Sequence, residues 1–265
     1  MTRFLVVPQW QGSPAARAML LIDGAEAIAQ DLPRSRTTVL PVPAEAGDAQ
    51  GTGVLRLSSL RRTYDLITEA IGENSEPTIT IGGDCSVTVA AVSALAGDLD
   101  DVALIWCDAH PDLHSTDTSP SGAFSGMALR ATLGEPSLPL HPRVGIHAQR
   151  VVLVGARDIE PGEKDFLHEV SLTSLSVIDL SDSAALTRAV AATGATRVYI
   201  HIDVDVFDPA EISGVSAASP FGARVADLVA ALRDIRSQFP VAGATIAGFA
   251  PRTPCLLYTS PSPRD

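Results

Sequence analysis

Short apolar runs rich in β-branched residues recur along the chain, and amphipathic stretches lie between them. The runs that we expect to form strands are residues 4–7, 37–40, 78–81, 102–106, 151–154, 176–178, 198–204 and 245–249. The stretches with helical periodicity are residues 15–29, 55–71, 86–95, 122–133, 162–169, 184–192 and 225–238. Strands that are apolar on both faces are covered by helices on both sides, and alternation of strand and helix favours parallel pairing. The sequence therefore predicts an α/β fold with a mostly parallel sheet between two layers of helices.

The length and composition of the chain limit what it can be. Its 265 residues fit one large α/β domain, because such folds routinely reach about 250 residues around a single sheet. An apolar share of 46% is too high for a disordered chain, and the apolar runs are too interrupted to span a membrane. The net charge of −12 repels phosphate backbones and suits cations. We therefore expect neither nucleic acid nor a membrane as a partner.

The N-terminus and the cysteines indicate the compartment. Residues 1–8 resemble a short strand and lack the longer apolar run and the cleavage site of an export signal. The three cysteines, Cys85, Cys107 and Cys255, form no C-x-x-C pair and are too scattered to stabilise a small secreted fold. We therefore expect a protein of the reducing cytoplasm.

The last residues, 255–265, do not resemble the end of a domain. Their sequence is similar to the translation of a DNA sequencing adapter, so we interpret them as a non-native tail; the alternative is a natural flexible tail. We accordingly expect one domain over residues 1–254, truncated at its C-terminus.

Three of the predicted strands end in residues that commonly bind metal ions. The segments concerned are Gly82-Gly83-Asp84-Cys85-Ser86, Cys107-Asp108-Ala109-His110-Pro111-Asp112 and Asp203-Val204-Asp205-Val206-Phe207-Asp208-Pro209. In open parallel sheets, ligands bind in the crevice beyond the carboxyl ends of the strands. We therefore expect these segments to contribute to one site.

The spacing within the segments favours a metal pair. In extended backbone alternate side chains point the same way, so Asp108, His110 and Asp112 share one side of a strand end, as do Asp203 and Asp205. Carboxylates that converge in a dry crevice repel one another unless cations lie among them. Oxygen-rich ligation with one imidazole suits Mn²⁺ or Mg²⁺ better than a structural zinc. Each motif alone also fits a turn or a helix cap, and only their joint occurrence favours metal.

Asp-Ala-His-x-Asp at 108–112 and Asp-x-Asp-x-x-Asp-Pro at 203–209, in this order, make residues 78–251 resemble the ureohydrolase superfamily of arginases, agmatinases and formiminoglutamases. The resemblance implies a three-layer α/β/α fold with an eight-stranded, mostly parallel sheet, related to that of lysine deacetylases. It also implies two Mn²⁺ ions per chain and a homo-oligomer, either a trimer or a hexamer.

The resemblance assigns metal-binding roles to six residues, which are Cys85, Asp108, His110, Asp112, Asp203 and Asp205. Asp108 and Asp203 would bridge both ions. Cys85 and Asp112 would complete one metal position, and His110 and Asp205 the other.

The resemblance further implies a reaction, the hydrolysis of a C–N bond in a linear guanidino or amidino compound. Two divalent ions that share one water lower its pKa enough to supply hydroxide at neutral pH. Asp112 would hydrogen-bond that hydroxide and then pass its proton to the departing amine. Urea or a simple amide would be the second product.

Four residues outside the metal motifs match the substrate contacts of arginases less completely, namely His114, Ser119, Ser121 and Glu160. The loop with Ser119 and Ser121 would bind the substrate carboxylate and Glu160 its α-amino group, so an arginine-like amino acid is the leading substrate. The two serines fit helix caps before residue 122 equally well. His114 stands where arginases commonly carry an asparagine, and its default interpretation is a surface histidine.

Three positions depart from the family pattern. Cys85 replaces a metal-binding histidine, and because a thiolate is softer than Mn²⁺ prefers, Zn²⁺ or Fe²⁺ also fits there. Ser125 stands at a catalytic position where many arginase-type relatives carry a proton-shuttling histidine, whose loss removes assistance worth about 10²- to 10⁴-fold. His141 and His147 are more typical of surface histidines than of a replacement. Gly248 replaces a glutamate that grips the guanidinium, at a cost of roughly 2–5 kcal/mol in binding.

Two functions from different classes follow. The first is a manganese-dependent hydrolase of guanidino or amidino C–N bonds. The second is a ureohydrolase-like protein that binds metal but has lost catalysis through Ser125 and Gly248, and that acts as a subunit or binding module. A dinuclear metallophosphatase fits less well, since the Asn-His and Gly-His ligand pairs of that class are missing. Lysine deacetylases have a related fold but use a single zinc ion. The second set of aspartates, at 203 and 205, fits a site for one ion poorly, so this class is disfavoured.

Overall fold

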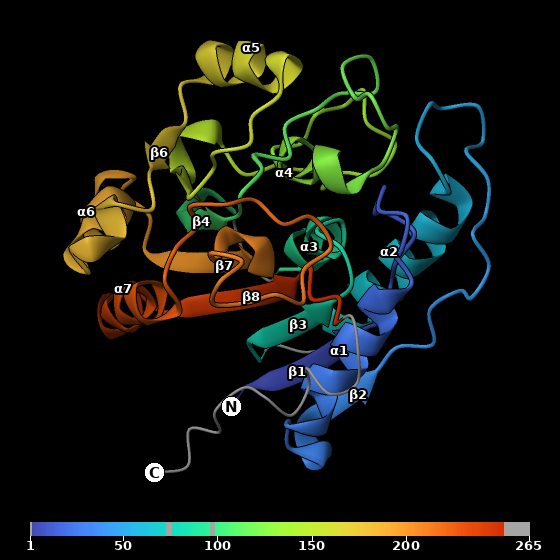
Figure 1. Ribbon diagram of the computed structural model, residues 1–265, viewed down its shortest axis with the longest axis horizontal. Helices are drawn as coiled ribbons and strands as arrows, with labels where there is room; N and C mark the ends of the chain where they lie inside the picture. Colours follow the sequence, from blue (N-terminus) through green and yellow to red (C-terminus); the bar gives the residue numbers. More distant parts are fainter. Residues whose placement is uncertain (1, 73–75, 96–98, 252–265) are drawn as a thin grey trace.

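The computed structural model describes residues 2–72, 76–95 and 99–251 of the chain. Its centre is one sheet of eight parallel strands in the order β2-β1-β3-β8-β7-β4-β5-β6 (Figure 1). The strands are β1 (Arg3–Val7), β2 (Thr37–Val39), β3 (Thr78–Gly82), β4 (Val102–Cys107), β5 (Val151–Val154), β6 (Thr173–Leu175), β7 (Arg197–Asp203) and β8 (Val241–Ala247).

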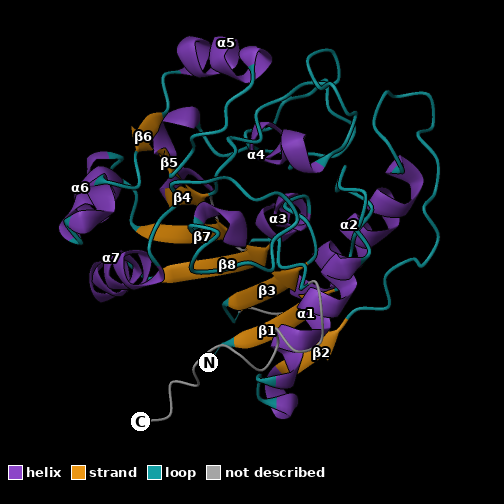
Figure 2. Cartoon of the chain, viewed as in Figure 1, coloured by secondary structure: helices purple, strands orange, loops and turns teal. Residues whose placement is uncertain are grey.

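Helices cover both faces of this sheet (Figure 2). They are α1 (Leu20–Gln30), α2 (Leu57–Gly72), α3 (Val87–Ser93), α4 (Ala128–Thr132), α5 (Pro161–Val170), α6 (Ala184–Ala192) and α7 (Val225–Gln238). The apolar residues of α2, α3 and α4 belong to one core cluster, and those of α6 and α7 to a second one on the other side. The predicted three-layer α/β/α fold with a parallel sheet is therefore confirmed.

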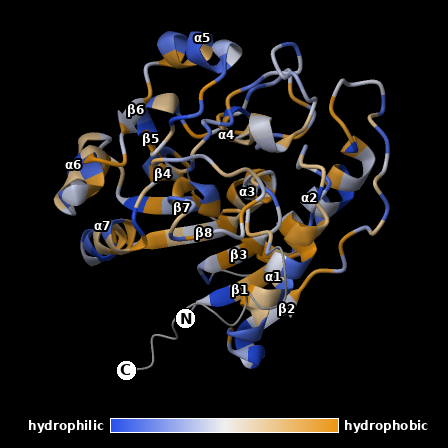
Figure 3. Ribbon diagram, viewed as in Figure 1, coloured by the Kyte–Doolittle hydropathy of each residue, from blue (hydrophilic) through white to orange (hydrophobic). Residues whose placement is uncertain are grey.

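The two core layers follow from the twofold alternation of side chains in the central strands. In β4, Leu104 and Trp106 pack into the layer under α2 and α3, whereas Ala103 and Ile105 pack into the layer over α6 and α7. All residues of β4 are buried, as a central strand with helices on both faces requires. Figure 3 shows this apolar centre, with hydrophilic residues frequent on the outer helices.

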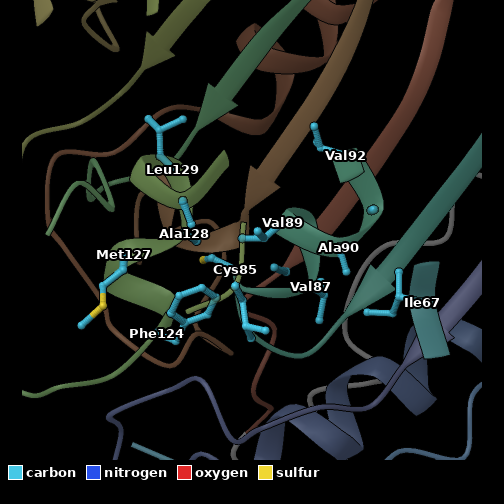
Figure 4. Close-up of a cluster of buried hydrophobic side chains, with 14 of the residues drawn as sticks. Ile67, Cys85, Val87, Val89, Ala90, Val92, Phe124, Met127, Ala128 and Leu129 are labelled. Atoms are coloured by element: carbon cyan, nitrogen blue, oxygen red, sulfur yellow. The ribbon is translucent and has the colours of Figure 1, made fainter. Parts of the chain in front are cut away.

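The helix α3 lies directly behind the site described below. Its residues Val87, Val89 and Ala90 are buried in a cluster with Phe124 and Met127, which Figure 4 shows together with Cys85. Since α3 begins immediately after the loop that carries Cys85, this packing fixes the position of that cysteine from behind.

Four predicted elements differ from the structure by three residues or more at one end, or are absent from it. The apolar run 176–178 is not a strand, because Asp179 accepts hydrogen bonds from the backbone and side chain of Ser176 and turns the chain. The edge strand β6 comes earlier and is largely exposed, which explains its polar sequence. The predicted helix 15–29 begins only at Leu20, and the helix 122–133 begins only at a 3₁₀ turn at Ser125. The strand 245–249 ends at Ala247, since Gly248 is left-handed with φ of +80°.

In the described ranges, no helix combines the length and the apolar composition that crossing a membrane requires. The segment 255–265, which we predict to be a non-native tail, lies outside the described residues.

Candidate active site

A pocket of about 330 Å³ opens at the carboxyl ends of the central strands. The strands β3, β8, β7 and β4 are consecutive neighbours in the sheet, so the loops that follow β3, β4 and β7 meet at one edge. These loops carry the three predicted metal-type segments. The order of the strands therefore brings the three segments to one edge of the sheet, where they line one pocket.

All eleven predicted site residues line this pocket: Cys85, Asp108, His110, Asp112, His114, Ser119, Ser121, Ser125, Glu160, Asp203 and Asp205. The structure thus brings the whole predicted set together. The pocket wall also includes Asp84, from the first of those segments, and Glu163 and Ser216, which the sequence did not single out.

Asp108, His110 and Asp205 form the first of two groups of close donor atoms. The His110 Nδ1 atom lies 3.0 Å from Asp205 Oδ2 and 3.5 Å from Asp108 Oδ1. The backbone N–H of Ala109 donates to Asp205 Oδ1 at 3.0 Å, which ties the loop after β4 to the loop after β7. One donor atom from each of the three side chains lies within 4.8 Å of the other two, which is a spacing that one metal ion can bridge.

Cys85, Asp108 and His201 form the second group, with donor atoms again within 4.8 Å of one another. The Cys85 thiol donates to Asp203 Oδ2 at 3.0 Å, and its sulfur lies 3.8 Å from Asp108 Oδ2. His201, on β7, was missed in the sequence analysis. The signal was present, because His201 precedes Asp203 by two residues and alternate residues of a strand share one face.

Burial and mutual repulsion make this cluster electrostatically unusual. Burial, and then the charges of Asp108 and other neighbours, raise the pKa of Asp112 well above its ordinary value. Burial and the charge of Asp108 likewise raise the pKa of Asp205 to about 6. Although burial lowers the pKa of His110, its hydrogen bonds to Asp108 and Asp205 outweigh this and raise it to about 12. The buried carboxylates thus attract cations strongly.

Six buried side-chain nitrogen and oxygen atoms in the described part of the chain have no hydrogen-bond partner, and two of them belong to this cluster. These two are Asp112 Oδ2 and His201 Nε2. Asp112 also has a left-handed backbone with φ of +53°, which is uncommon for a residue with a side chain and typical of functional sites. Unpartnered oxygen and nitrogen atoms beside crowded carboxylates are what a site for divalent ions requires, so the residues present fit a metal centre.

Arg157 fixes the loops on the outer side of this cluster. Its guanidinium donates to five backbone carbonyl oxygens, which are those of Gly155, Asp205, Val206, Ser219 and Pro220. One of these carbonyls belongs to Asp205 itself, at 2.8 Å. The position of Asp205 therefore depends on Arg157.

His114 is buried, with 6% of its surface exposed, so its interpretation as a surface histidine is wrong. Its Nε2 atom lies 3.0 Å from Glu160 Oε2, and its Nδ1 atom is 3.1 Å from the Thr118 hydroxyl. A histidine held at both nitrogens orients the glutamate beside it. His114 and Glu160 therefore act as one unit at the pocket wall.

Glu163 was missed, although its sequence context could have revealed it. It lies three residues after Glu160 at the start of α5, and its Oε2 accepts the backbone N–H of Glu160 at 3.0 Å, as in a capping box. Its other oxygen accepts the backbone N–H of Leu113 at 3.1 Å. Glu163 thus joins α5 to the loop after β4.

The three serines lie in loops of the pocket. The hydroxyls of Ser119 and Ser121 accept the backbone N–H groups of Gly122 and Ala123, so they cap turns, because no helix begins at 122. Ser125 places its side chain at the pocket wall. His147 is exposed, as predicted, and neither His141 nor His147 is among the residues around the pocket.

Gly248 lies against Asp203 and leaves no room for a side chain. A Cβ atom at this position would overlap the Asp203 carboxylate, and φ of +80° disfavours any residue other than glycine. The backbone N–H of Gly248 donates to the carbonyl of Gly83 at 2.8 Å and holds this conformation. A glutamate therefore does not fit the backbone at position 248.

Comparisons with known proteins agree with this geometry. Residues 25–253 match the model of the arginase family. An arginase of Staphylococcus aureus (strain COL) is 33% identical over 152 residues, which are 54% of this chain and 50% of the relative. The chain therefore spans about half the length of this curated relative.

Solved structures share the fold. The arginase of Entamoeba histolytica, crystallised with L-ornithine, superimposes with a TM-score of 0.84 at 19% identity and covers 95% of this chain and 92% of its own. An arginase from Bacillus subtilis gives a TM-score of 0.77 at 22% identity and covers 95% and 91%. At these identities the superpositions establish the fold alone.

Proposed function

Because the chain belongs to the arginase family, we propose that it is a metal-dependent hydrolase that cleaves a C–N bond in a linear guanidino or amidino compound. Urea or a simple amide is the second product. The observation that carries this proposal is the group of buried carboxylates and imidazoles in one pocket, with Asp112 Oδ2 left unpartnered among the described residues.

Six residues would hold two Mn²⁺ ions in this proposal: Cys85, Asp108, His110, Asp112, Asp203 and Asp205. Asp108 and Asp203 would be shared between the two positions. When bound, the ions supply Lewis-acid chemistry that lowers the pKa of a water. The thiolate of Cys85 is the one soft ligand of the set, so Zn²⁺ or Fe²⁺ also fits the position that it serves.

The protein groups then bind and orient the substrate. Asp112 Oδ2 faces the pocket without a partner in the described residues, so it is free to accept a proton from the attacking water and to deliver it to the leaving nitrogen. Glu160, oriented by His114, would accept a hydrogen bond from a substrate amino group. The hydroxyls of Ser119 and Ser121 can still donate to a substrate carboxylate, since in the structure they act as acceptors. An arginine-like amino acid matches this arrangement.

The experiment is a screen of guanidino and amidino compounds for release of urea or amide with and without Mn²⁺. We expect Mn²⁺-dependent release from at least one compound, and near-complete loss in Asp112→Asn. Asp65→Asn, an exposed position on α2, is the matched control that keeps full activity. If no compound is hydrolysed by the metal-loaded protein, the proposal fails.

A binding protein without catalysis is the second candidate, and Gly248 favours it. The pocket has no glutamate at this position to grip a guanidinium, and Ser125 cannot titrate near pH 7. This candidate predicts that guanidino compounds bind without turnover and that Ser125→His creates turnover. Calorimetry of binding beside the release assay distinguishes the two.

The proposal also includes a homo-oligomer, a trimer or hexamer, and a cytoplasmic location. Light scattering on the purified chain tests the oligomeric state, and fractionation of cells that express it tests the location.

A further inference from the structure

His201 is a fully buried histidine next to the proposed metal centre, and the assignment of ligands above does not use it. It lies on β7, between Trp106 of β4 and Thr245 of β8. None of its surface is exposed. An imidazole at such a position needs partners for both ring nitrogens.

One face and one nitrogen of the ring are accounted for by neighbouring side chains. The ring stacks on Trp106, with 3.7 Å between the ring centroids. The Nδ1 atom lies 2.8 Å from the hydroxyl of Thr88, on α3. These two contacts fix the orientation of the ring, and they determine where the other nitrogen points.

The remaining nitrogen, Nε2, has no hydrogen-bond partner in the described residues and is directed at Cys85 and Asp108. Its distance to Asp108 Oδ2 is 3.8 Å, which is too long for a hydrogen bond. The Cys85 sulfur is also 3.8 Å from this oxygen. In a tetrahedral zinc site, neighbouring ligand atoms are about 3.3–3.8 Å apart, as bond lengths of about 2.0–2.3 Å require. The two distances to Asp108 Oδ2 are thus close to the spacing of ligands around one zinc ion, and the donor atoms of all three side chains lie within 4.8 Å of one another.

We propose that His201 Nε2 is a direct metal ligand and that, with Cys85 and the Asp108 and Asp203 carboxylates, it makes this position selective for Zn²⁺ over Mn²⁺. Thiolate and imidazole are the ligands that zinc prefers, whereas Mn²⁺ prefers oxygen. Thr88 orients the imidazole through Nδ1, as partners of metal-bound histidines do. The other metal position, which His110 and Asp205 serve, has mainly oxygen ligands and so still suits Mn²⁺. This inference rests on the proposed function in one respect, which is that the two metal positions belong to one metal centre.

The test is the affinity of the metal-stripped 265-residue chain for Zn²⁺ and Mn²⁺, measured by competition with a chelator. His201→Asn places an amide nitrogen near the place of Nδ1, so it can keep the contact with Thr88 while it removes Nε2. We expect His201→Asn to weaken Zn²⁺ binding by more than about 100-fold, since loss of a group that only orients a ligand costs about 10- to 100-fold. Thr88→Val keeps Nε2 and removes only the group that orients the ring, so it should weaken Zn²⁺ binding by no more than about 10- to 100-fold. Mn²⁺ affinity at the other position should change less than about threefold in both variants.

A spectroscopic measurement on the unsubstituted chain keeps the test independent of variant folding. X-ray absorption at the zinc edge should show one sulfur at about 2.3 Å and one imidazole in the coordination sphere. The inference is overturned if the zinc is coordinated by oxygen alone or by sulfur without imidazole. It is also overturned if the spectrum of His201→Asn still shows the imidazole. A loss of Zn²⁺ affinity in His201→Asn of about 100-fold or less also overturns it.

These outcomes separate the inference from the proposed function. Loss of Zn²⁺ affinity in His201→Asn supports the inference even where no guanidino compound is hydrolysed. Conversely, if the chain shows Mn²⁺-dependent hydrolysis and His201→Asn binds Zn²⁺ as tightly as the unsubstituted chain, the inference is refuted. The proposed hydrolase function then still stands.

Discussion

A methyl group at Gly248 would be forced against the carboxylate of Asp203, so Gly248→Ala is a direct test of how the end of β8 positions that aspartate. Two costs add up. A side chain at positive φ costs about 1–2 kcal/mol, and overlap in a packed interior costs about 1–3 kcal/mol. We therefore expect the free energy of unfolding to fall by about 2–5 kcal/mol. Because Asp203 must move away, affinity for the divalent ions should fall by about 10- to 100-fold.

Gly194 provides the matched control. It also has a positive φ, +72°, but a Cβ atom there would meet nothing within 4 Å. Gly194→Ala therefore reports the backbone strain without the overlap, and it should cost about 1–2 kcal/mol and leave metal affinity unchanged.

Thermal unfolding and metal titration of both variants make the comparison. At roughly 2–4 °C for each kcal/mol, we expect Tm to fall by about 4–20 °C in Gly248→Ala and about 2–8 °C in Gly194→Ala. Equal losses of stability in the two variants, with equal metal affinity, would show that Asp203 does not depend on a glycine at 248.

Three further predictions concern the surroundings of the pocket. Arg157→Lys cannot reach the five carbonyls that the guanidinium spans, so we expect a loss of about 2–4 kcal/mol in urea unfolding, whereas Arg188→Lys, in an exposed ion pair, should stay within about 0.5 kcal/mol. Burial raises the pKa of Glu163 above 4.5, so the stability that it contributes is full below that value and is lost as the pH rises through the raised pKa. Glu163→Gln should flatten this part of the pH dependence of Tm, and a decline as steep as that of the unsubstituted chain contradicts the assignment. Saturation with Mn²⁺ at about 100 times its Kd should add about 2.7 kcal/mol of stability, and a chelator should remove it; a Tm that responds to neither contradicts the metal centre.

The arrangement of the sheet was predictable because the pattern of β4 is simple. A fully apolar run such as 102–106 fits a central strand with helices on both faces, and the polar β6 is harder to recognise. The sequence predicted a strand at 176–178 because the run there is apolar, but hydrogen bonds from Ser176 to Asp179 turn the chain instead. A local side-chain contact of this kind outweighs a short apolar pattern.

The site could be predicted where its residues repeat at strand spacing, as Asp108, His110 and Asp112 do. His201 was not predicted as a site residue because an imidazole within an apolar strand is typical of the core. Its role depends on Cys85, which is far from it in the sequence. Burial of His114 was equally unpredictable, since its partner Glu160 comes from a distant part of the chain. Proximity between distant segments, and not residue type, is what the sequence alone could not supply.

The strand β8, the last described strand along the chain, occupies the middle of the sheet, between β3 and β7. A ribosome therefore completes β1 to β3 and β4 to β7 before the strand that joins them exists. Until residues 241–247 emerge, the inner edges of both half-sheets expose unpaired backbone groups, which favour pairing with other nascent chains. Synthesis of this protein thus has a vulnerable interval that lasts until β8 has emerged, in which chaperone protection matters most.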